Sequence, residues 1–290
     1  GMGGRRDEPA YRLAPMLPAL TPLVFRLMIW PFVLASRVSG YRPVLLCGPL
    51  SRPAGLSMFM PLRNEIFDRA FGEAFAVFDQ IVVLGAGWDT RAYGTLPSGD
   101  ARIFEVDTGP TQAAKIAALR DAGIDAQHVT FVETDFNQVS WPEALLASGF
   151  DSDQKTLVLW EGVTMYLPEE SVNETLSAIS ELGPGSQVVF DYFAREFIGN
   201  EGGYRLIGPY LKWIVRVTYG ERFVFGIPLR HVGQRGVEAL LESHGLRLKR
   251  FDMLGSVGRL NACYGFAVGE NTEQSTTGRA TPSEGYRRQA

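Results

Sequence analysis

The sequence predicts an α/β fold in which a doubly wound, mostly parallel sheet ends in an antiparallel hairpin. Two observations support this prediction. From residue 81 onward, short and nearly continuous apolar runs alternate with longer helical patterns, and such runs are typical of strands buried on both faces of a parallel sheet. The last two β-rich runs follow each other without an intervening helix, so they must pair in antiparallel fashion.

Seven strands are expected. The parallel ones are Ile81–Leu84, Ile103–Val106, Val129–Glu133, Thr156–Trp160 and Gln187–Phe190, and the hairpin is Arg247–Met253 with Ala262–Val268. Helical patterns cover Met58–Phe78, Thr111–Ala122 and Glu169–Leu182. Pro168 suits the start of the last of these helices and Gly183 its end.

Three parts of the chain are distinguished by composition. We expect an N-terminal helical or lid segment at 1–57, one α/β domain at 58–268, and a disordered polar tail at 269–290. An aromatic-rich insertion at about 192–233 follows the carboxyl end of a strand, which is where α/β enzymes place their binding crevice.

The stretch Leu20–Ala35 is the most apolar part of the chain. A membrane-spanning helix needs about 20 apolar residues, whereas Pro22, Arg26 and Pro31 interrupt this one. We therefore expect a helix packed on the domain, a lid over an apolar site, or a membrane-surface contact rather than a transmembrane segment. A cytoplasmic protein is the corresponding expectation.

Charge and composition disfavour several function classes. The chain has 28 basic and 32 acidic residues, a net charge of −4, so no overall positive field attracts the phosphate backbone of a nucleic acid. Its two cysteines and three histidines lie far apart in sequence. The chain therefore has too few suitably spaced cysteine and histidine residues to favour a structural metal site or a histidine-dependent hydrolase.

A glycine loop follows the first strand. Gly85, Ala86 and Gly87 allow a sharp turn and a close approach of backbone to ligand. Asp107 ends the next strand, where a carboxylate can accept hydrogen bonds from a ribose diol. The pair predicts a cofactor that carries a nucleoside.

The surrounding residues favour S-adenosylmethionine over other nucleosides. Thr90 occupies the position of the third glycine in a dinucleotide fingerprint, and no phosphate-binding GxxxxGK[ST] motif occurs. Asp135 follows the third strand, where it could accept a hydrogen bond from an adenine amino group while Phe136 packs on the ring.

These residues lie within motifs that resemble the leucine carboxyl methyltransferase family, which includes tetracenomycin-type polyketide O-methyltransferases. The motifs are IVVLGAGWDTRAYGTL from Ile81, FEVD at Phe104–Asp107, LWEGVTMYLPEE at Leu159–Glu170 and VVFDY at Val188–Tyr192. The resemblance covers about residues 58–268. It implies a Rossmann-like class I methyltransferase fold with S-adenosylmethionine as methyl donor.

The resemblance also implies roles for individual residues. Arg63 resembles the arginine that holds the cofactor carboxylate, which agrees with the bidentate grip of a guanidinium on a carboxylate. Glu161 resembles a glutamate at the edge of the cofactor. By the same resemblance, the glycines of the loop lie under the methionine part, Asp107 binds ribose, and Asp135 and Phe136 contact adenine.

Candidates for the acceptor pocket are weaker. Tyr192 ends the fifth strand beside Asp191, Tyr166 follows the EGVTM motif, and His231 follows the aromatic insertion. A carboxylic acid acceptor is already ionised at neutral pH, whereas a phenol of pKa about 10 needs help from a base. Of the three histidines, His231 is the best placed to be that base.

The sequence thus predicts an S-adenosylmethionine-dependent O-methyltransferase that acts on a small organic acceptor through a carboxylate or a polyketide-like hydroxyl. A carboxyl methyltransferase of a peptide or protein C-terminus is the alternative within this class. A nucleoside-binding domain without catalysis and a pyridine-nucleotide reductase are alternatives from other classes.

Overall fold

The computed structural model describes residues 8–13, 56–94, 99–134, 141–205, 208–209, 212–213, 216, 221–258 and 262–271. The apolar stretch at 20–35 and the predicted adenine contacts Asp135 and Phe136 lie outside these residues, as does the chain from 272 to 290.

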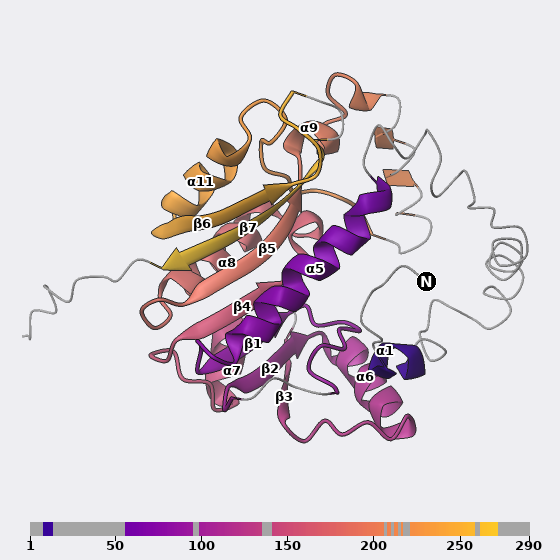
Figure 1. The fold of residues 1–290 in the computed structure, drawn as a ribbon, viewed down its shortest axis with the longest axis vertical. Helices are drawn as coiled ribbons and strands as arrows, with labels where there is room; N and C mark the ends of the chain where they lie inside the picture. The colour runs from indigo at the N-terminus through magenta and orange to yellow at the C-terminus, as the bar shows by residue number, and fades with distance from the viewer. Residues whose placement is uncertain are drawn as a thin grey trace, which may run out of the picture.

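One sheet of seven strands forms the centre of the described structure (Figure 1). The strands are β1 (Gln80–Leu84), β2 (Arg102–Asp107), β3 (Val129–Glu133), β4 (Thr156–Trp160), β5 (Gln187–Phe193), β6 (Leu246–Met253) and β7 (Tyr264–Asn271). Their order is β3-β2-β1-β4-β5-β7-β6. The first five pair in parallel, and β7 pairs antiparallel with both β5 and β6. The predicted fold class is confirmed.

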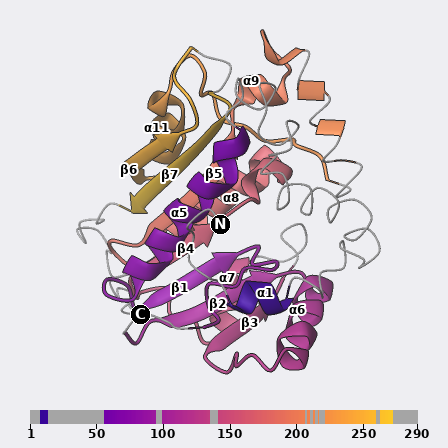
Figure 2. The ribbon, with the colours of Figure 1, turned by 45° about the vertical axis from the view of Figure 1, so that its right-hand side comes forward.

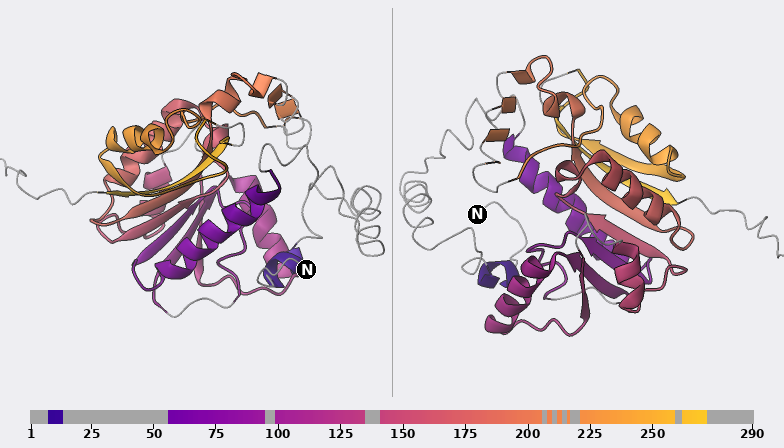
Figure 3. Two further views of the ribbon diagram at one scale, coloured as in Figure 1. Left: turned by 45° about the horizontal axis from the view of Figure 1, so that its top comes forward. Right: turned by 180° about the vertical axis from the view of Figure 1, so that it is seen from behind.

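Helices cover both faces of this sheet. The longer ones are α5 (Leu56–Ala74), α6 (Gly109–Asp121), α8 (Glu169–Ser180) and α11 (Gln234–Glu242); α1 (Glu8–Leu13), α7 (Trp141–Ala147), α9 (Arg195–Ile198) and the 3-10 helix η3 (Thr164–Tyr166) are short. Helix α5 crosses one face, whereas α8 and α11 pack on the other (Figure 3). Helix α1 lies beside α6 (Figure 2) and buries Leu13 in the core. No helix in the described ranges combines the length and apolarity that crossing a membrane requires.

Two strands, β5 and β7, continue three residues beyond their predicted carboxyl ends. Strand β5 continues to Phe193, because β7 pairs with it along its whole length. Strand β7 continues to Asn271, so residues 269–271 belong to the sheet and not to the tail. The Asn271 side chain explains this extension, since its amide donates to Leu182 O at 2.5 Å and its oxygen accepts from Gly185 N at 2.8 Å.

The strand order places the carboxyl ends of β1 and β4 side by side. Both strands are buried along their whole length, as their apolar runs predict. The order of the sheet reverses between them, and open α/β sheets bind ligands in the crevice at such a reversal. The segments that follow β1, β2 and β4 are therefore expected to form a ligand-binding site.

A buried ion pair joins the sheet to α6. Lys115 Nζ lies 2.6 Å from Glu105 Oε2, and both residues are about 1% exposed. The Lys115 ammonium also lies over the Tyr93 ring, 5.2 Å from its centroid. Burial raises the pKa of Glu105, and the charge of Lys115 acts in the opposite direction. Each charge is therefore tolerated inside the protein because the other is present.

We expect the substitution Lys115→Met to lower the free energy of unfolding by about 3–5 kcal/mol at pH 7, because it leaves Glu105 as an uncompensated buried charge. Burial raises the pKa of Glu105, and the variant lacks the Lys115 charge that lowers it, so Glu105 of the variant takes up a proton more readily and the loss should shrink as the pH falls toward 5. Urea unfolding at the two pH values measures both effects. The double variant Glu105→Gln, Lys115→Met should recover most of the stability, and an equal loss in both variants would contradict this account.

Candidate functional site

The glycine loop after β1 is shaped by its two glycines. Gly85 and Gly87 have φ of 67° and 42°, a backbone conformation that favours glycine. A Cβ on Gly85 would lie 2.5 Å from Val163 Cγ2, so the loop packs tightly on the segment after β4. A Cβ on Gly87 would find no atom nearer than Gly85 O at 3.8 Å. The loop therefore has a packed side at Gly85 and an open side at Gly87.

Asp107 is fixed to the same loop. Its Oδ2 accepts a hydrogen bond from Gly87 N at 2.5 Å, and its Oδ1 accepts one from Thr108 N at 2.7 Å. The backbone N–H groups of Gly85 and Ala86 both donate to Val106 O, at 2.8 and 3.1 Å. The carboxylate that ends β2 and the glycines that follow β1 thus form one unit. A carboxylate oxygen has a second lone-pair direction, so Asp107 can still accept from a hydroxyl.

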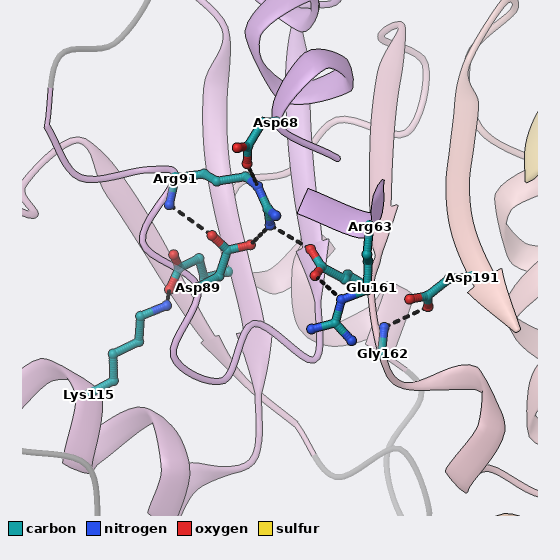
Figure 4. A network of polar contacts seen from close by, with 9 residues as sticks. Arg63, Asp68, Asp89, Arg91, Lys115, Glu161, Gly162 and Asp191 are labelled. Atoms are coloured by element: carbon teal, nitrogen blue, oxygen red, sulfur yellow. Dashed lines mark hydrogen bonds and ion pairs between the residues drawn. The ribbon is translucent and has the colours of Figure 1, made fainter. Parts of the chain in front are cut away.

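Four charged side chains form a row beside the glycine loop (Figure 4). Glu161, directly after β4, pairs through Oε1 with Arg63 Nε of α5 at 2.7 Å and through Oε2 with Arg91 Nη1 at 2.6 Å. Arg91 Nη1 also lies 2.6 Å from Asp89 Oδ2. The row therefore links α5, the segment after β1 and the segment after β4, and all four side chains are mostly shielded from solvent.

The electrostatics of this row favour a permanent cation at Arg63. Burial works against the guanidinium, but Glu161, Tyr264 and Asp191 together outweigh it, so the pKa of Arg63 lies above its ordinary value. Burial raises the pKa of Glu161, and the two arginines act in the opposite direction. Arg63 can therefore offer charge-assisted N–H donors to an anionic ligand at neutral pH.

Asp191 and Tyr264 lie on the far side of Arg63. The Tyr264 hydroxyl donates to Asp191 Oδ2, and Asp191 Oδ1 accepts from Gly162 N at 2.7 Å. The guanidinium of Arg63 is hydrogen-bonded to the same hydroxyl. Burial raises the pKa of Asp191, while Tyr264 and Arg63 act against this shift.

The structure brings together the six predicted cofactor residues that it describes. Gly85, Ala86, Gly87 and Asp107 form the loop unit, and Arg63 pairs with Glu161 beside it. Their contacts with a cofactor stay a prediction, as do those of Asp135 and Phe136.

The three weaker acceptor candidates do not form a group. Tyr166 is half-buried and its ring lies 5.4 Å from that of Phe223. Tyr192 is completely buried and points to the sheet face opposite Asp191, because successive strand residues alternate in direction. His231 is exposed in the turn before α11.

The other two histidines have local partners. His128 Nε2 lies 2.6 Å from Ala92 O, and His244 Nδ1 lies 2.9 Å from Leu240 O near the end of α11. Both arrangements tie the ring to backbone, as expected of structural residues.

Sequence reasoning missed Asp89, Arg91 and Tyr264. The first two stand in the quoted motif GAGWDTR, so the motif held a signal that we interpreted only through its glycines. Tyr264 carries no such signal, because it comes from the last strand and reaches Arg63 only through the pairing of β7 with β5.

An aromatic cluster borders the site through Tyr264. Phe193 lies at its centre, and the ring centroids of Tyr264 and Phe223 are 4.7 and 4.6 Å away. The insertion is held over η3 by a hydrogen bond from Val224 N to Met165 O at 2.8 Å. Tyr166, Phe193 and Phe223 keep part of their surface exposed. The site therefore has a charged region around Arg63 and an apolar region at this cluster.

Known proteins resemble this chain in sequence. Residues 48–180 match the family described as leucine carboxyl methyltransferase. A provisionally named S-adenosyl-L-methionine-dependent methyltransferase of Mycobacterium marinum is 26% identical over 229 residues, which are 78% of this chain and 66% of that protein. One of Mycobacterium tuberculosis with the same provisional name is 34% identical over 146 residues, which are 49% of this chain and 46% of that protein. The chain therefore spans less than two thirds of the length of these relatives.

A solved structure supports the fold. The crystal structure of a provisionally named methyltransferase from Thermobifida fusca YX aligns with a TM-score of 0.53 and 17% sequence identity, covering 79% of this chain and 87% of that one. The family match includes α5, the glycine loop, Asp107 and Glu161, which together build the site described above. Over residues 48–180, the chain is therefore similar to the leucine carboxyl methyltransferase family.

Proposed function

We propose that this protein is an S-adenosylmethionine-dependent methyltransferase that transfers a methyl group to an oxygen of a small organic acceptor. The observation that carries the proposal is the position of the glycine loop. Because β1 lies between β2 and β4, the loop is flanked by Asp107 on one side and by the Arg63–Glu161 pair on the other. The names of the mycobacterial relatives support S-adenosylmethionine-dependent methyl transfer, without naming an acceptor.

The residues present fit S-adenosylmethionine. The open side of Gly87 is a cradle that a Cβ would fill, and it leaves room for a ligand against the backbone. Arg63 would hold the carboxylate of the methionine part, and Asp107 would accept hydrogen bonds from the ribose hydroxyls. Asp135 and Phe136 stay our candidates for the adenine end. When bound, the cofactor supplies a methyl group on a positively charged sulfur, which is open to displacement by an oxygen nucleophile.

The chain's own contribution is to bind, align and shield. An in-line displacement needs the reacting atoms about 3–3.5 Å apart and aligned. Glu161 and Arg91 fix the position of Arg63, and the hydrogen bond between Gly87 and Asp107 fixes the loop. The partly exposed rings of Tyr166, Phe193 and Phe223 offer an apolar surface to an acceptor, which supports a small organic molecule over a polar peptide terminus.

The chemistry of the described residues favours an acceptor oxygen that is already ionised. Deprotonating a phenol of pKa about 10 at pH 7 costs roughly 4 kcal/mol without a base. His128 and His244 are bound to backbone carbonyl groups, and His231 is exposed. A carboxylate needs only orientation, so we place carboxylates first and hydroxyl groups second among the acceptors.

A two-part experiment tests the activity. Titration calorimetry with S-adenosylhomocysteine measures cofactor binding, and transfer of labelled methyl from S-adenosylmethionine is followed over small aromatic carboxylates, phenols and a peptide C-terminus. Binding together with transfer to a small acceptor supports the proposal. Transfer to the peptide alone would favour protein carboxyl methylation. Binding without any transfer would favour a non-catalytic nucleoside-binding domain.

Replacing Arg63 by lysine should weaken S-adenosylhomocysteine binding about 10- to 100-fold, because an ammonium group cannot grip a carboxylate with two parallel hydrogen bonds. Calorimetry measures the change. Arg69→Lys is the matched control, since Arg69 lies on the same helix in an exposed pair with Glu65. Equal affinities for the two variants would remove Arg63 from the site.

Replacing Gly87 by alanine should abolish measurable S-adenosylhomocysteine binding, since the added Cβ occupies the open side of the loop. Gly123→Ala is the control, because Gly123 also has a positive φ and its added Cβ would meet no atom within 4 Å, but it lies after α6. The free energy of unfolding should fall by a similar amount in both variants, about 1–2 kcal/mol, because a non-glycine residue then adopts the left-handed backbone conformation. Retained binding by folded Gly87→Ala would show that the loop faces away from the ligand.

A further inference from the structure

Two side chains contact Arg63 from opposite sides. The proposed function gives a role to the contact with Glu161 but none to the contact with Tyr264. Glu161 contacts the guanidinium from the segment after β4. On the other side lies Tyr264 of β7, which is completely buried although it comes from the far end of the sequence. The antiparallel pairing of β7 with β5 places Tyr264 opposite Phe193, and therefore on the same sheet face as Asp191.

The donor and acceptor roles of the Tyr264 hydroxyl are defined. Its single proton goes to Asp191 Oδ2. The phenol oxygen then has only lone pairs to offer, and it accepts from the Arg63 guanidinium. Asp191 is itself fixed, because its other oxygen accepts from Gly162 N. A chain of hydrogen bonds thus runs from the backbone after β4 through Asp191 and Tyr264 to Arg63.

The space around Arg63 is matched to this arrangement. A Cβ on Gly162 would lie 3.2 Å from Arg63 Nη1, and the φ of Gly162 is 69°. Gly162 therefore lets the guanidinium lie close to the backbone between Glu161 and Tyr264. An arginine side chain loses much conformational freedom when it is fixed, so a ligand gains affinity when the protein has fixed the side chain beforehand.

We propose that Tyr264 and Asp191 are positioning residues that orient Arg63 toward the carboxylate of an amino-acid-bearing ligand. This inference rests on the proposed function. A positioning role differs from a purely structural role in the core. Removing the Tyr264 hydroxyl should weaken the binding of only that part of the ligand which Arg63 contacts. The nucleoside part is expected at Asp107, Asp135 and Phe136; of these, Asp107 is held by Gly87 and Thr108 and not by the Tyr264–Asp191 pair.

Two ligands separate these parts of the site. S-adenosylhomocysteine carries the amino-acid group, whereas 5′-methylthioadenosine has the same nucleoside and sulfur without it. For Tyr264→Phe we expect S-adenosylhomocysteine binding to weaken by about tenfold or more, with 5′-methylthioadenosine binding within about twofold of the wild type. In a methyl-transfer assay, KM for S-adenosylmethionine should rise while kcat changes little.

Tyr204→Phe is the matched control. Tyr204 is also a buried phenol of the aromatic region, and its hydroxyl donates to a backbone oxygen, that of Ala262, at 3.1 Å. Its substitution removes one buried hydrogen bond to a backbone carbonyl, and both ligands should bind this variant as they bind the wild type. If Tyr264→Phe does not fold, Asp191→Asn replaces it, because asparagine keeps the volume and an acceptor for Gly162 but offers an N–H group to the hydroxyl.

The outcomes are distinct. A loss confined to S-adenosylhomocysteine supports the positioning role. An equal loss for both ligands would make Tyr264 a structural residue, and no loss for either would disconnect it from Arg63; both overturn the inference and leave the proposed function intact. If the wild-type protein bound neither ligand, the proposed function would fail and the inference with it.

Discussion

The carboxylate of Glu161 is the group on which the geometry of the site depends. It lies between two guanidinium groups, 2.7 Å from Arg63 and 2.6 Å from Arg91. Without it, two like charges would face each other in a region largely shielded from water, where their repulsion is poorly screened. The pairing also joins three separate pieces of chain: helix α5, the segment after β1 and the segment after β4. A single carboxylate thus links helix α5 to the segments that follow two strands.

The sheet supplies the positions that this charge network needs. Parallel neighbours β2, β1 and β4 end at the same edge, so Asp107, the glycine loop and Glu161 meet although they are far apart in sequence. The packing of Gly85 against Val163 brings the loops after β1 and β4 into contact, and the hydrogen bond from Gly87 N to Asp107 does the same for the loops after β1 and β2. The pairing of the apolar strands thereby determines where the polar residues of the site come together.

Successive side chains of β5 point to opposite faces of the sheet. Asp191 and Tyr192 are neighbours in sequence but therefore lie in different surroundings. Asp191 points toward Arg63 and takes part in a hydrogen-bond chain, whereas Tyr192 points to the other face and packs against Gly265 of β7. Within the described structure, the Tyr192 hydroxyl is buried without a hydrogen-bond partner. The same strand thus contributes to the candidate site with one side chain and to the core with the next.

The sequence by itself determined the fold class, the strand positions to within a few residues, and the identity of Arg63, Gly87, Asp107 and Glu161 as candidates. These features are local: apolar runs specify buried strands, and a motif keeps its residues together along the chain. The partners of the candidates were decided only by the tertiary structure. Arg91 and Tyr264 reach Glu161 and Arg63 through strand order and an antiparallel pairing. Since such contacts depend on which strands lie side by side, no periodicity or spacing along the sequence encodes them.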